Sequence, residues 1–288
     1  MGHHQVYGLP RTPAFKRVVS LLGDGAGAAG ATGVGPGSLE EIAEATIAAS
    51  DDGLERAKGD EGLAYCLYLM ATLTRAANEN DFATALSAVG VESRFVPRGT
   101  PDSTIQSSDQ SSPYTVFDLV SGFSAAVDRH LRETRSRTDI GELAQLAASE
   151  SLSALCSARA VTLFGTTKET VQQSLRTLST EKGFSILAHE FFARFSRRYL
   201  EYHLSRELSN HVGLNRRFAG AREHNAFLQQ LDDHCRVVTS VVKQFAGEWY
   251  SLHKFQQDIT LRQAKGFAAH AVDKVRDALR FQEDRNAD

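Results

Sequence analysis

The stretch from Phe184 to Val212 reads FSILAHEFFARFSRRYLEYHLSRELSNHV, and it decides the fold class. Its apolar residues recur three or four positions apart, which is the spacing of an α-helix. Proline interrupts a helix interior at a cost of about 3 kcal/mol. It is absent here and throughout residues 114–288. A long proline-free region rich in Ala, Leu, Arg, Glu and Gln predicts successive helices, and therefore an all-α protein.

Working outward from this stretch, we predict a multi-helix bundle of about nine helices, with the last three forming the core. Capping sequences mark several helix starts, among them Ser38 with Glu41, Ser112 with Pro113, and Thr166 with Glu169. A further short helix is expected over 14–22. The main helices are expected over 38–58, 61–78, 81–89, 113–135, 139–159, 166–179, 184–212, 221–253 and 260–282.

The chain divides into an N-terminal segment, 1–37, and a helical body, 38–288. The first contains a glycine-rich stretch, 23–37, that predicts a flexible linker. Within the body, 38–96 and 114–288 form two candidate subdomains joined by a polar loop, 97–113. The apolar side chains before the linker suggest a docking peptide, for which three states stay open: docked on its own body, docked on a neighbouring copy, or disordered. Its residues are Val6, Tyr7, Leu9 and Pro10.

The composition of the chain argues against several classes of function. The formal net charge is −3, without the basic excess of a dedicated nucleic-acid binder. No apolar run approaches the roughly 20 residues that span a bilayer, so no membrane association is expected. Cys66, Cys156 and Cys235 are widely spaced and odd in number, which is typical of reduced thiols in a cytoplasmic protein.

Two motif-like stretches lack the context that their chemistry requires. Gly25–Gly30 matches GxGxxG, but no second strand follows to complete a dinucleotide-binding unit. His189 and Glu190 begin a zinc-protease motif that ends in Ala193, so the second histidine ligand is missing. No cofactor and no metal are therefore expected.

Helical periodicity places polar residues on the apolar sides of two neighbouring helices. They are His203, Glu207 and Asn210 on the first helix, and His224 and His234 on the second. A hairpin about residues 213–220 would bring these sides together. Buried polar groups need hydrogen-bond partners. The cluster therefore predicts a structural network, an interface with another chain, or a catalytic or metal site.

The opposite face of the first helix is charged, with Glu190 and Glu201 among arginines, and we interpret it as solvated. The same region has a local excess of arginine, which makes it a candidate patch for phosphate or a partner. Glutamates interleaved at helical spacing favour an ordinary solvated face instead. The arginines of this patch are Arg194, Arg197, Arg198, Arg216 and Arg217.

Two segments, SRELSNHVG over Ser205–Gly213 and GEWYS over Gly247–Ser251, resemble an uncharacterised family of all-helical bacterial proteins. The likeness covers most of the chain after residue 38. It implies a component of a multigene system of the phage-defence type, and it attaches no activity and no functional residue.

We therefore expect a non-enzymatic scaffold, adaptor or subunit of a larger assembly that binds other protein chains, either copies of itself or different proteins. Two alternatives remain open: an enzyme that uses the His203 and Glu207 cluster, and a nucleic-acid-associated protein that uses the arginine-rich helix.

Overall fold

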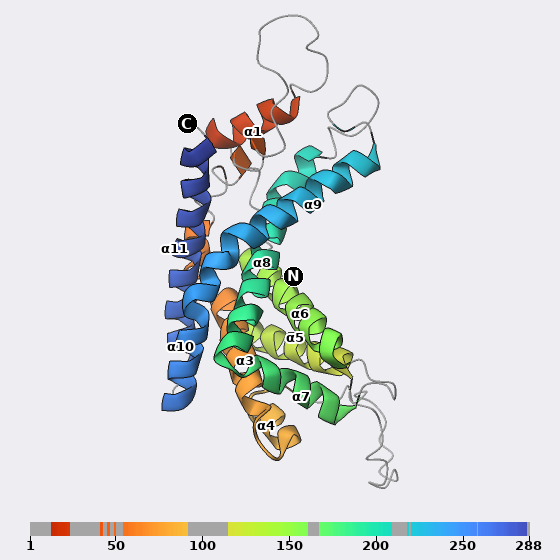
Figure 1. Cartoon of the computed structure of the whole chain (residues 1–288), viewed down its shortest axis with the longest axis vertical. Coiled ribbons are helices and arrows are strands. Elements are labelled where there is room, and N and C mark those ends of the chain that lie inside the picture. Colours follow the sequence, from red (N-terminus) through yellow and green to blue (C-terminus); the bar gives the residue numbers. More distant parts are fainter. Residues whose placement is uncertain are drawn as a thin grey trace, which may run out of the picture.

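The structure, a computed structural model, describes residues 13–23, 41, 42, 45, 46, 49, 54–91, 115–160, 167–208, 218, 220–257 and 259–286. Its elements in these ranges are all helices, so the all-α prediction is confirmed (Figure 1). None of them combines the length and the apolar character needed to cross a membrane. The elements are α1 (Pro13–Gly23), α3 (Glu61–Ala76), α4 (Phe82–Ala88), α5 (Val116–Glu133), α6 (Asp139–Ala160), α7 (Lys168–Leu178), α8 (Glu181–Leu208), α9 (Ala221–Val238), the 3-10 turn η2 (Thr239–Val242), α10 (Lys243–Gln256) and α11 (Leu261–Asn286).

Helices α3 and α8 occupy the centre of the fold, which corrects the prediction that the last three helices form the core. Helix α3 packs against α5, α6, α7 and α11, while α8 packs against α6, α7, α9 and α10. Twelve of the sixteen residues of α3 are buried. A helix that is apolar on nearly every side has to be enclosed by others, and α3 is such a helix.

A close crossing of α3 and α6 fixes the position of the central helix. Asp60 caps α3 by accepting a 2.8 Å hydrogen bond from the amide of Leu63, and it accepts another from the hydroxyl of Thr138. Thr138 in turn accepts from the amide of Gly141 at the start of α6. Burial raises the pKa of Asp60, although these donors oppose the shift. The two helix starts are thus tied through one carboxylate.

Several helix boundaries differ from the predicted ones. Thr115, with Asp118, caps α5 in place of Ser112, and Thr167, with Thr170, caps α7 in place of Thr166. The predicted helix over 221–253 is divided into α9 and α10 by the turn η2. Buried residues nevertheless continue across the turn at a spacing of four, through Val238, Val242, Ala246 and Tyr250.

Helix α1 packs against α8, and its Val18 is fully buried. The docking peptide, the glycine-rich stretch after Gly23 and the polar loop 97–113 lie outside the described residues.

Candidate functional site

Aromatic and histidine side chains from α10 and α11 surround a hollow of about 390 Å³. The backbone after α10 turns sharply because Gln257 adopts a left-handed conformation, φ 54°, and α11 begins a few residues later. The two helices then run side by side (Figure 1). We call this space the aromatic hollow, and its lining residues are Phe245, Trp249, His253, Gln263, Gly266, Phe267 and His270.

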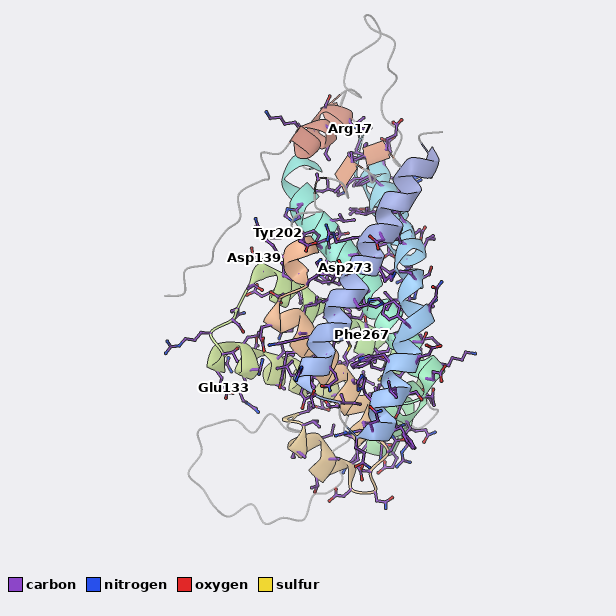
Figure 2. The ribbon with its side chains drawn as sticks, turned by 90° about the vertical axis from the view of Figure 1, so that its left-hand side faces the viewer. Arg17, Glu133, Asp139, Tyr202, Phe267 and Asp273 are labelled. Carbon is purple, nitrogen blue, oxygen red and sulfur yellow. The ribbon has the colours of Figure 1, made fainter. Side chains whose placement is uncertain are left out.

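Ring contacts hold the walls of the aromatic hollow together. Trp249 stacks on Phe267 with ring centroids 4.6 Å apart, and Phe245 meets the same ring at 5.7 Å. Phe245 also contacts His270 edge to face at 4.7 Å, and Trp249 lies 5.1 Å from His253. Phe267 is itself buried, on the length of α11 that faces the viewer in Figure 2. The walls are therefore set in place by the fold.

The apolar surface continues beyond the aromatic hollow along the outer side of α10. Leu252 is 52% exposed and Phe255 is 89% exposed. Together with Phe245 and Trp249 they follow the spacing i, i+4, i+7, i+10, which places them along one side of the helix. At 1.5 Å per residue this stripe is about 15 Å long. Phe245 and Trp249 are partly buried.

A second hollow, of about 190 Å³, is lined by charged side chains of α6, α8 and α9. We call it the arginine hollow. Its cations are Arg194, Arg197, Arg198 and Arg236, and its carboxylates are Glu150, Glu201 and Asp232. Arg197 contacts both Glu201 and Asp232, and Arg198 pairs with Glu150.

Glu190 does not line the arginine hollow, but it forms ion pairs with two of the arginines that do. It pairs with Arg194 of its own helix and, at 2.9 Å, with Arg236 of α9. Burial alone would raise the pKa of Glu190, but the two guanidiniums outweigh it and hold that pKa below its usual value. The side chains of Glu190 and Arg194 are only 19% and 17% exposed. Helix α9 thus covers this face of α8 in part, whereas the sequence analysis interpreted it as solvated.

The polar cluster predicted from periodicity is only partly described. His203 is half-buried between Tyr199 and Tyr202, and burial lowers its pKa. His224 contacts Phe218, and His234 is half-buried on α9. The side chains of Glu207 and Asn210 lie outside the described residues, as do Arg216 and Arg217 of the arginine patch. The cluster stays a prediction.

One buried polar group was missed by the sequence analysis. The hydroxyl of Tyr250 accepts a 3.1 Å hydrogen bond from Thr74 and lies 3.1 Å from Ser179, whose oxygens accept from Lys254. A serine beside a lysine can act as a nucleophile with its base. Here Ser179, Thr74 and Tyr250 are buried, and Lys254 bonds the carbonyl at the end of α7. The group therefore ties α3, α7 and α10 together.

Comparisons of the chain with known protein families, with curated proteins and with solved structures found no match. Within the described ranges, no group of three or more His, Cys, Asp or Glu residues could hold a metal ion. The function is accordingly inferred from the residues of this chain that line the two hollows.

Proposed function

We propose that this chain is a non-enzymatic helical adaptor or scaffold that binds an α-helix of another protein chain in the aromatic hollow. One observation carries the proposal: the hollow opens onto an exposed apolar stripe that ends at Phe255. Water-exposed apolar surface of this kind is typical of sites that a partner covers. Tryptophan is among the side chains that most often dominate the binding energy of such contacts, and phenylalanine is enriched in them.

The shape of the surface favours a helix over a compact ligand. A small molecule would fill the hollow and leave Leu252 and Phe255 in water. A partner helix with apolar residues at matching spacing would place one side chain in the hollow and cover the rest of the stripe. The polar groups at the rim, His253, His270 and Gln263, would meet the edge of such a partner.

Site-specific photo-crosslinking in the native host tests this. A crosslinking residue in place of Leu252 should form an adduct in which the attached peptide belongs to a helical segment of a second chain. The same residue in place of Phe117 is the matched control, because Phe117 is 78% exposed on α5. Equal labelling at both positions, or no adduct at Leu252, would contradict the proposal.

A blocking variant makes the test specific to the hollow. Gly266 lines the hollow, and a Cβ atom built on it meets nothing within 4 Å. Gly266→Leu should therefore fold normally, fill the space that the partner side chain needs, and abolish the Leu252 adduct. Gly266→Ala, which adds one methyl group, should preserve it.

A further inference from the structure

The arginine hollow brings four guanidiniums from two helices together in one half-buried place. Three of its four arginines, Arg194, Arg197 and Arg198, lie within five residues of α8, where like charges repel one another. Arg236 approaches from α9. Four carboxylates balance these four guanidiniums: three line the hollow, and Glu190 pairs with Arg194 and Arg236 from outside the lining.

Each guanidinium has five N–H donors, and the ion pairs of the hollow use only some of them. Arg194 bonds Glu190 through Nη1, and Arg236 uses Nε and Nη1 on Asp232 and Glu190. Arg197 uses Nε on Glu201 and places Nη1 3.5 Å from Asp232. Among hydrogen bonds between described residues, the Nη2 groups of these three arginines are not used. The hollow therefore keeps donors for a further acceptor.

We propose that the arginine hollow binds the phosphate group of a small molecule. Guanidiniums match phosphate oxygens in charge and in paired N–H geometry. The hollow has a volume of about 190 Å³, which leaves room for a tetrahedral oxyanion with some water.

Glu150 occupies the place of the ligand when the hollow is empty of anions. It is the most exposed of the three carboxylates, with its side chain 48% exposed, and it contacts only the rim arginine, Arg198. Asp232 and Glu201 are held more firmly, at 12% and 28% exposed, and position Arg197 and Arg236. An incoming phosphate group would displace the Glu150 carboxylate into water and take over its donors on Arg198.

This inference is independent of the proposed helix-binding function, because the two hollows share no residue. Its test uses two variants that remove the same ion pair from opposite ends, Glu150→Gln and Arg198→Gln. If the pair is only structural, both variants should behave alike in every assay. If the hollow binds phosphate, their effects on binding should have opposite signs.

The binding assay is isothermal titration of the full chain with pyrophosphate as the probe. We expect Glu150→Gln to tighten pyrophosphate binding about tenfold, since a competing carboxylate is neutralised, and Arg198→Gln to weaken it at least tenfold. Glu142→Gln is the control for the loss of one surface carboxylate, because Glu142 forms a separate exposed pair with Arg137. Its affinity should equal that of the unmodified chain.

Two further titrations distinguish the sources of the phosphate group. Adenosine monophosphate represents a soluble phosphomonoester, and phosphatidic acid vesicles represent a lipid headgroup. Binding of the soluble probes, with opposite effects of the two variants, supports the proposal. Binding of vesicles alone, no binding of pyrophosphate, or equal effects of Glu150→Gln and Arg198→Gln would overturn it.

Discussion

Replacing Gly62 by alanine should destabilise the fold through the crossing of α3 and α6. A Cβ atom on Gly62 would lie 2.5 Å from the Cα atom of Gly141, and 3.2 Å from Oδ1 of Asp60. Carbon atoms in contact normally stand about 3.5–4.0 Å apart, so the helices must separate by about 1 Å. The nearest atom belongs to backbone, and backbone cannot rotate away.

The magnitude follows from two opposing contributions. Overpacking a well-packed contact costs about 1–3 kcal/mol. Alanine recovers at most about 1 kcal/mol of helix propensity relative to glycine. We expect a net loss of about 1–2 kcal/mol, which for a protein of this size lowers Tm by roughly 2–8 °C. Urea unfolding followed by far-ultraviolet circular dichroism measures the loss directly.

Alanine variants of two other glycines serve as controls for Gly62→Ala. A Cβ on Gly141 would meet its nearest atoms at 3.2 Å and 3.3 Å, so Gly141→Ala should cost less than Gly62→Ala. A Cβ on Gly266 meets nothing within 4 Å, so Gly266→Ala should be neutral or stabilising. If Gly62→Ala melts at or above the temperature of Gly266→Ala, the close crossing of α3 and α6 is wrong.

Three further predictions concern buried groups. Burial raises the pKa of Cys66, and raises that of Cys235 to about 12. Thiol reagents at neutral pH should therefore label these two cysteines only when the protein unfolds, which a time course of thiol labelling measures. Burial also lowers the pKa values of His189 and His203 in the folded state. Below pH about 6.5, the ordinary pKa of histidine, the unfolded state therefore binds more protons than the folded state, and the free energy of unfolding should fall as the pH drops through this value. Urea midpoints across this range should lose that slope when both histidines are replaced by glutamine. Tyr250→Phe should cost about 1–2 kcal/mol in the same assay, because Thr74 and Ser179 lose a buried partner; an unchanged midpoint would refute the tie between α3, α7 and α10.

The fold class was predictable from the sequence because it depends on local properties. The absence of proline over 114–288 and the helical spacing of apolar residues are enough to predict helices. The close crossing of α3 and α6 was not predictable from such local properties. Gly62 and Gly141 are 79 residues apart, and neither is marked in the sequence as the neighbour of the other. Contacts of this kind depend on how helices are placed, which periodicity does not specify.

The arginine hollow shows the same limit at a candidate site. Periodicity correctly grouped Glu190, Arg194, Arg197, Arg198 and Glu201 on one face of α8. A charged face is normally solvated, so that interpretation followed from the sequence. Asp232 and Arg236 of α9 cover the face instead, and they bring the charges that allow it to be half-buried. The signal was present in the DDHCR segment, where Asp232 and Arg236 are four residues apart, but it could be interpreted only once the packing of α9 was known.

The apolar residues on the core-facing side of α9 are buried, whereas some of those of α10 are only partly buried. Before the turn η2, Phe227, Leu231 and Cys235 are buried. After it, Phe245 and Trp249 stand half-exposed in the aromatic hollow, and Ala246 and Tyr250 are the residues buried in the core. The tighter winding of a 3-10 turn would bring the core-facing position earlier in the chain, whereas Ala246 and Tyr250 come one residue later than Phe245 and Trp249, so winding does not account for the difference. The neighbouring helix accounts for it: Phe245 and Trp249 pack on Phe267 of α11 at the edge of the core, where one side of each ring stays accessible from the aromatic hollow.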